Sequence, residues 1–253
     1  MDAENLPENI SKARFNEVLS RYEPLIKSIS QDKTSETPGQ PSLLELDEFR
    51  YKEATETLRS DNPKRKISHQ DVKTLVNWKL RHGKFRSTLM KLVSSNDEAV
   101  LEKTIQEAVA EYWSDKDATK AMNAIKTLKG IGPATASLIL SVHDPERVIF
   151  FSDEAFWWLC CGGRKSPIKY NAKEYQQLAE LAVKMAKRLQ VGATDIEMAA
   201  YVAMKDSPSE SEPAPESRPK DDMRHRAPAK RKIASVTDTD VGPLRRSSRH
   251  KTS

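Results

Sequence analysis

Residues 128–140, with the sequence LKGIGPATASLIL, constrain the fold more than any other part of the chain. Gly130 and Gly132 bracket a single apolar residue, and Pro133 follows at once. Glycine permits backbone angles that other residues avoid, and proline is favoured in the first turn of a helix. The segment therefore predicts a helix that ends at Leu128, a tight turn and a second helix, which together form a helical hairpin across residues 119–142.

The two glycines also let another molecule approach the backbone of the turn. The amides of the turn and of the start of the second helix are expected to point outward together, where the helix dipole favours an anion. Ile131 is expected to anchor the turn in the core, while Thr135 and Ser137 are small enough for the two helices to pack closely. The arrangement predicts a site for a backbone phosphate of a nucleic acid, with Gly130, Ile131, Gly132 and Thr135 as the DNA-binding residues of the hairpin.

The rest of the first 204 residues also has the periodicity of helices. Apolar residues recur three and four positions apart, for example in residues 15–22 and 101–112. A last helix is expected at about residues 172–190, and the strand-like run 147–151 has no partner strand. The pattern therefore predicts one all-α domain that covers residues 1–204.

The bulk composition favours a soluble intracellular protein. Hydrophobic residues make up 37% of the chain, which is enough for one core. No stretch reaches the roughly 20 apolar residues that span a bilayer, and the amino terminus lacks the pattern of a signal peptide. Cys160 and Cys161 are adjacent, so they cannot join distant segments through a disulfide, and no spacing of Cys and His residues fits a zinc site. We expect a monomer with no membrane association, no metal ion and no cofactor.

The composition changes abruptly after residue 204. Residues 205–253 are rich in Ser, Pro, Glu and Lys, which predicts a disordered basic tail. Residues 207–253 hold 11 Lys and Arg against 7 Asp and Glu, which leaves 31 against 30 in the body of the chain. Any nucleic-acid surface on the body must therefore be a local patch. The basic clusters at 230–232 and 245–251 predict a nuclear protein that binds an import receptor, with a merely solubilising tail as the alternative.

One such patch is the segment WKLRHGKFR, residues 78–86. Its four basic residues are candidate contacts for DNA backbone phosphates, namely Lys79, Arg81, Lys84 and Arg86. Its two aromatic residues, Trp78 and Phe85, have the chemistry to stack on a base. Burial in the core is nevertheless the expectation for both, because large aromatic side chains are usually buried.

At the hairpin, the chain resembles the helix-hairpin-helix DNA glycosylase superfamily. The hairpin of that family reads leucine, any residue, glycine, a hydrophobic residue, glycine, two variable residues, threonine and alanine. The matching positions here are Leu128, Gly130, Ile131, Gly132, Thr135 and Ala136. In such enzymes an extended piece and a catalytic aspartate follow, and Asp153 after VIFFS lies at the matching place. The close resemblance covers residues 119–159, and it implies a glycosylase-like helical fold that binds DNA.

The chain departs from the family at three points. Members that also cleave the DNA strand have a lysine directly before the hairpin threonine, where this chain has Ala134. The family's aspartate is commonly followed by threonine and histidine, but Asp153 is followed by Glu154 and Ala155. The four clustered cysteines of the iron-sulfur branch are missing. The resemblance therefore implies a monofunctional glycosylase without lyase activity, if the chemistry is kept.

In that role the Asp153 carboxylate would stabilise the positive charge that develops on the sugar and would orient a water molecule. The competing interpretation is that Ser152 or Asp153 simply caps the helix that begins at Glu154. At the level of function, the alternatives are a non-catalytic nucleic-acid-binding or chromatin-associated adaptor, and a scaffold that never binds nucleic acid.

Overall fold

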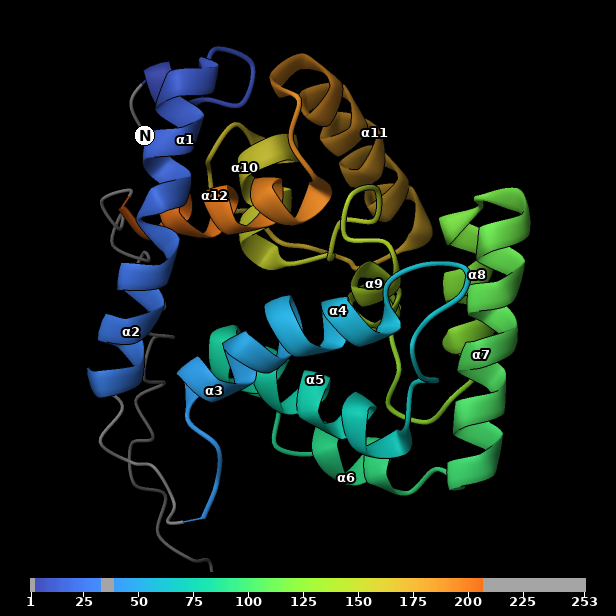
Figure 1. Cartoon of the computed structure of the whole chain (residues 1–253). Coiled ribbons are helices and arrows are strands. Elements are labelled where there is room, and N and C mark those ends of the chain that lie inside the picture. Colours follow the sequence, from blue (N-terminus) through green and yellow to red (C-terminus); the bar gives the residue numbers. More distant parts are fainter. Residues whose placement is uncertain (1–2, 33–38, 207–253) are drawn as a thin grey trace, which may run out of the picture. The chain divides into compact units, whose positions relative to one another are not determined.

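The computed structural model describes residues 3–32 and 39–206, and every regular element in these residues is a helix (Figure 1). The elements are η1 (Ala3–Asn5), α1 (Lys12–Ser20), α2 (Tyr22–Asp32), α3 (Leu43–Glu48), the π-helix η2 (Phe49–Ala54), α4 (Thr55–Leu58), α5 (His69–His82), α6 (Leu89–Ser94), α7 (Glu98–Asp115), α8 (Ala118–Ile125), α9 (Pro133–His143), α10 (Asp153–Cys161), α11 (Ala172–Leu189) and α12 (Ala193–Asp206). The predicted all-α class is confirmed for this part of the chain. The strand-like run 147–151 belongs to the link between α9 and α10 and pairs with no strand there.

Several of these helices begin at a side-chain cap. Ser42, Ser68 and Asn171 each accept a hydrogen bond from the amide three positions on, and the acidic side chain at that position accepts one from the amide of the cap. Such reciprocal pairs supply partners for N–H groups that a helix start leaves without one. The starts of α3, α5 and α11 are therefore determined by residues close together in the sequence.

The carboxyl-terminal end of the domain differs from the prediction. The helix expected at residues 172–190 is present as α11, but it is not the last, because α12 follows it and ends at Asp206. Nine residues of α12 are buried, and they include four alanines and a glutamate. A helix buried around most of its surface has no clear polar face, so its periodicity is weak. The rest of the predicted tail, with its basic clusters and the import signal, lies outside the described residues.

The helices fall into two groups. The group that we call the terminal lobe contains α1, α2, α10, α11 and α12, and the group that we call the middle lobe contains α3 to α9 with η2 (Figure 1). Helix α9 lies near the centre of Figure 1 and contacts α4, α5 and α8. Its residues 134–143 are all buried, which a helix near the surface could not achieve. The hairpin thus places its second helix in the core of the middle lobe.

A buried ion pair joins the two lobes. Arg50 of η2 contacts Glu197 of α12 through both of its terminal nitrogens, at 2.6 and 2.8 Å, and both side chains are about 2–3% exposed. The Tyr51 hydroxyl donates to the same carboxylate at 2.8 Å, and the Arg50 guanidinium lies 3.8 Å from the centre of the Trp78 ring. Trp78 is fully buried, as expected. Each charge has its partner, and the Arg50 guanidinium also lies 5.0 Å from the centre of the Phe150 ring, beside the pocket described below.

Candidate functional site

The predicted hairpin is present as α8, a turn over residues 126–132, and α9. Helix α8 ends at Ile125, three residues before the expected position, and successive turns carry the chain through Leu128. Ile131 is 5% exposed and anchors the turn in the core, as expected. Thr135 is also buried, at 3% exposed. Both residues, which the sequence nominated for DNA contact, can therefore present only backbone atoms to a ligand.

The two glycines of the turn have different roles. Gly130 has φ +76°, and a Cβ atom there would lie 2.9 Å from Cβ of Leu92 and 3.1 Å from the backbone nitrogen of Val93. Gly130 is therefore required both by its backbone angle and by the close approach of α6. Gly132 is extended, with φ −94° and ψ −178°, and a Cβ atom there would have no neighbour within 4 Å. Of the two, only Gly132 faces open space.

The protein itself uses part of the predicted anion site. The Lys129 amide donates to Oδ1 of Asn96, whose Nδ2 donates back to the Lys129 carbonyl, both at 2.9 Å. The Ile131 amide donates to the carbonyl of Leu128 at 3.2 Å. The expectation that all the turn amides point outward is therefore wrong, because the amides of Lys129 and Ile131 already donate to acceptors of the protein.

The start of α9 remains available. Its N-cap, Gly132, has no side-chain cap, and the first hydrogen bond of the helix runs from the Ala136 amide to the Gly132 carbonyl at 2.9 Å. Pro133 carries no N–H. Within the described residues, the amides of Gly132, Ala134 and Thr135 have no hydrogen-bond acceptor. The uncapped helix start, and not the turn, is thus the part of the hairpin that can receive an anion.

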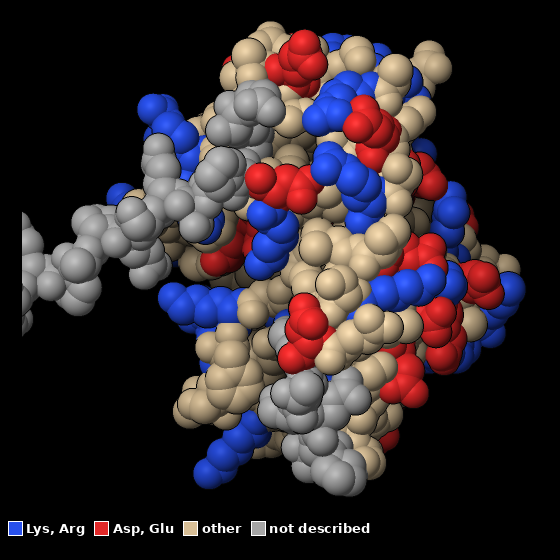
Figure 2. Space-filling view, turned by 90° about the vertical axis from the view of Figure 1, so that its left-hand side faces the viewer, with Lys and Arg blue, Asp and Glu red and all other residues tan. Residues whose placement is uncertain are grey.

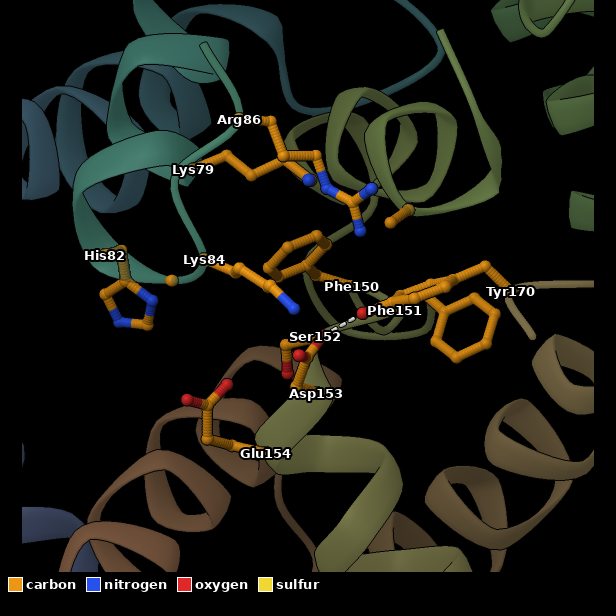
Figure 3. A pocket seen from close by; sticks show the side chains of 12 residues that line it. Lys79, His82, Lys84, Arg86, Phe150, Phe151, Ser152, Asp153, Glu154 and Tyr170 are labelled. Atoms are coloured by element: carbon orange, nitrogen blue, oxygen red, sulfur yellow. Dashed lines mark hydrogen bonds between the residues drawn. The ribbon is translucent and has the colours of Figure 1, made fainter. Parts of the chain in front are cut away.

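A pocket lies beside this helix start, where the two lobes meet (Figure 3). Its lining comes from the end of α5 and the loop after it, from α9, from the link to α10 and its first residues, and from the link to α11: Lys79, His82, Gly83, Lys84, Arg86, Ala134, Phe150, Phe151, Ser152, Asp153, Glu154 and Tyr170. The pocket thus brings together Asp153 and Ala134, which precedes the hairpin threonine. Its free volume is about 40 Å³, which is room for a few water molecules.

The capping question is answered by Ser152. Its side chain accepts a hydrogen bond from the Ala155 amide at 3.1 Å, so Ser152 is the N-cap of α10. Asp153 is the first residue inside the helix, and its carboxylate accepts a hydrogen bond from the Tyr170 hydroxyl (Figure 3). The carboxylate also lies in the first turn of α10, at the positive end of the helix dipole. Capping therefore does not account for Asp153, and its carboxylate faces the pocket.

A second carboxyl group follows directly. The Glu154 side chain is 12% exposed, and its Oε1 lies 4.0 Å from Nζ of Lys205, near the end of α12. Burial raises the pKa of the Glu154 carboxyl, against the opposing influence of Lys205. Two adjacent carboxyl groups thus line one pocket in different surroundings. Neither Glu154 nor Tyr170 was predicted for the site, because no local pattern identifies them. Burial decides the position of Glu154, and a hydrogen bond to Asp153, 17 residues away, decides that of Tyr170.

Three of the four predicted basic residues line the pocket. Burial lowers the pKa of the Lys79 ammonium, the like charge of Arg86 lowers it further, and Asp153 opposes the shift. Lys84 and Arg86 are exposed on the loop after α5. Arg81 is not part of the lining. The pocket therefore has a positive rim above two carboxyl groups.

The loop that carries this rim also exposes an aromatic side chain. Phe85 lies between Lys84 and Arg86 and is 72% exposed, so the expectation that it packs in the core is wrong. Helix α5 ends at His82, and the loop that follows takes Phe85 away from the buried face of the helix. An exposed phenylalanine flanked by two cations combines a stacking surface with phosphate contacts.

The charges elsewhere are mixed. On the face drawn in Figure 2, Lys and Arg side chains are interspersed with Asp and Glu, and no large area has one sign. This agrees with the nearly equal numbers of basic and acidic residues in the body of the chain.

Two tryptophans follow Asp153 in α10, but neither lines the pocket. The indole nitrogen of Trp157 donates to the Ser166 carbonyl, and that of Trp158 donates to the Asn5 carbonyl.

No protein-family model matches the chain, and neither the curated proteins nor the solved structures contain a significant match. None of the described helices is long and apolar enough to cross a membrane. In the same residues, no group of three or more His, Cys, Asp or Glu side chains is arranged to hold a metal ion.

Proposed function

We propose that this protein is a DNA-binding protein of glycosylase-like fold, and that it removes a base as a monofunctional DNA N-glycosylase. The observation that carries the proposal is the meeting of Asp153, the hairpin's helix start and a basic rim in one pocket. The hairpin receives a backbone phosphate at the uncapped start of α9. The pocket beside it receives the nucleotide whose base is removed.

The chemistry assigned to Asp153 follows from its charge and place. As the bond between C1′ of the sugar and the base nitrogen breaks, positive charge develops on the sugar, and a nearby carboxylate stabilises it. Asp153 also accepts the proton of a water molecule as its oxygen bonds to C1′, and the leaving base takes up a proton. With Ala134 in place of a lysine, no amine at this position attacks the sugar, so the product is an intact abasic site.

A base does not fit the free volume of about 40 Å³, so binding requires the rim to move. Lys84 and Arg86 are exposed and therefore able to move toward phosphates on either side of the extruded nucleotide. Phe85 between them takes the space that the nucleotide leaves in the base stack. The Phe85 ring thus replaces the stacking that the neighbouring bases lose when the nucleotide leaves the helix.

The test of catalysis uses the full chain with duplexes that contain uracil, alkylated or oxidised bases. We expect abasic product on at least one of them, and loss of at least two orders of magnitude in rate for Asp153→Asn. Asp97→Asn is the matched control, because it makes the same change at the N-cap of α7, which does not line the pocket. Equal rates for the wild type and Asp153→Asn, or no product on any duplex, would refute the catalytic role.

The test of binding uses salt dependence. Replacement of both Lys84 and Arg86 by alanine is expected to reduce the slope of log affinity against log salt by roughly 2, since each lost phosphate contact contributes about 0.9. Lys187→Ala is the control, because Lys187 lines a separate hollow beside Glu146. Gly132→Asp is expected to keep the fold, since aspartate is a good N-cap, and to repel the phosphate. Unchanged binding by Gly132→Asp would contradict the role of the hairpin.

A second candidate function is a non-catalytic DNA-binding or chromatin-associated adaptor. The small free volume of the pocket favours it, because an adaptor needs no room for a base. In that case DNA binding responds to Gly132→Asp and to the loss of Lys84 and Arg86, while Asp153→Asn changes nothing.

A further inference from the structure

The pocket contains a side chain that reaches Asp153 from outside the hairpin. Tyr170 belongs to the link between α10 and α11, and its hydroxyl donates to Oδ1 of Asp153 (Figure 3). Its ring lies 5.4 Å from the Phe151 ring, and the Arg86 guanidinium lies 5.7 Å from its centre. Tyr170 therefore forms one wall of the pocket as well as a partner of the carboxylate.

The backbone of Tyr170 is held in an unusual conformation. Its φ of +52° is in the left-handed region, which residues with a side chain seldom adopt. The neighbours on both sides are fixed by one carboxylate: the amides of Lys169 and Asn171 both donate to Glu174, and Asn171 caps α11 in return. Such a conformation persists only where its surroundings determine it, and it is found more often at functional sites.

The hydroxyl remains a donor over the physiological range of pH. Burial, and then the hydrogen bond to Asp153, raise the pKa of Tyr170. A single O–H group can satisfy one carboxylate oxygen, which leaves Oδ2 of Asp153 without this partner.

The charges around Asp153 explain why such a restraint matters. Lys79, Lys84 and Arg86 line the same pocket, yet within the described part of the chain no cation lies within ion-pair distance of the Asp153 carboxylate. A carboxylate free to rotate about its side-chain bonds would turn toward one of these cations. An ion pair of that kind would neutralise the charge that the proposed reaction needs.

We infer that Tyr170 is a positioning residue, which holds the Asp153 carboxylate away from the basic rim and directs its second oxygen toward the sugar of a bound nucleotide. The inference rests on the proposed function. It assigns to a residue outside the hairpin a role in orienting the group that stabilises a cation.

The test uses binding, so that it does not depend on which base is removed. The probe is a duplex in which one nucleotide is replaced by a pyrrolidine abasic analogue, whose protonated ring nitrogen carries the charge that develops on the sugar. The comparison is a duplex of the same sequence with an uncharged abasic analogue. The ratio of the two affinities measures how well the carboxylate is directed at the cation.

We expect the full-length wild type to prefer the cationic duplex, and Tyr170→Phe to lose roughly tenfold of that preference, in the range of a hydrogen bond to a charged group. Binding of the uncharged duplex should stay within about twofold, because the phenyl ring keeps its packing. Tyr175→Phe is the control, since that hydroxyl is also buried but bonds at 3.4 Å to the carbonyl of Ile149. A variant that combines Tyr170→Phe with Asp153→Asn should have the same preference for the cationic duplex as Asp153→Asn alone.

The outcomes separate the two claims. A wild type that prefers the cationic duplex, with Tyr170→Phe retaining the full preference, overturns the role of Tyr170 and leaves the proposed function in place. A wild type without any preference overturns the catalytic part of the proposed function, and the inference with it. The inference is also overturned if the double variant loses more of the preference for the cationic duplex than Asp153→Asn alone. In that case the Tyr170 hydroxyl would act independently of the carboxylate.

Discussion

Replacement of Gly130 by alanine tests whether the hairpin turn is held by packing against α6. The added methyl group would lie 2.9 Å from Cβ of Leu92 and 3.1 Å from the backbone nitrogen of Val93, and backbone atoms cannot move aside as the end of a side chain can. The φ of +76° adds strain for any residue with a Cβ atom. Both effects act on the folded state alone, so the substitution should destabilise the protein.

The magnitude follows from these two contributions. A residue with a side chain in the left-handed region costs about 1–2 kcal/mol, and insertion of a methyl group into a packed site costs about 1–3 kcal/mol. The lower entropy of the unfolded alanine variant offsets roughly 0.4–1 kcal/mol of this. We expect a loss of about 2–4 kcal/mol, which in a protein of this size lowers the melting temperature by roughly 5–15 °C.

Gly132→Ala is the matched comparison, because it lies two residues away in an extended conformation with open space around it. Its free energy of unfolding should stay within about 1 kcal/mol of the wild type. The assay is urea denaturation of the full chain followed by circular dichroism, with the melting temperature as a second readout. If Gly130→Ala is as stable as the wild type, or if the two alanine variants are equally destabilised, packing against α6 does not hold the turn.

Three further predictions concern stability. Glu197→Gln leaves the buried Arg50 without its charge partner and should cost about 3–5 kcal/mol, whereas Glu23→Gln, in an exposed pair, should leave the urea midpoint unchanged; a small effect at Glu197 would argue against a tight junction between the lobes. Ser152→Ala removes the cap of α10 and should lower the free energy of unfolding by about 1 kcal/mol in urea denaturation. An unchanged free energy would mean that α10 does not depend on this cap. Burial lowers the pKa of His143 to about 4, so between pH 6.5 and 4 the unfolded chain binds a proton that the folded protein does not, and stability falls as the pH falls through this window. His143→Asn should show a shallower fall when unfolding is measured across that range, and an identical slope would contradict the assignment.

The features that the sequence predicted correctly are local. The hairpin and the buried Ile131 depend on residues within a few positions of one another, so their pattern is visible in the sequence. The all-α class follows from the same periodicity. The end of the domain was harder to predict, because α12 is buried around most of its surface and shows little contrast between its faces.

The features that only the tertiary structure decided depend on distant partners. Which of the two glycines is indispensable depends on α6, which lies more than thirty residues earlier in the chain. Asp153 could be separated from the role of helix cap only when Ser152 was seen to cap α10 and Tyr170 to bind the carboxylate. Phenylalanine is a residue type usually found in the core, but Phe85 is exposed because α5 ends at His82 and the chain continues as a loop. The sequence determines which local shapes the backbone adopts, whereas burial and charge pairing arise only when segments far apart in the sequence pack together.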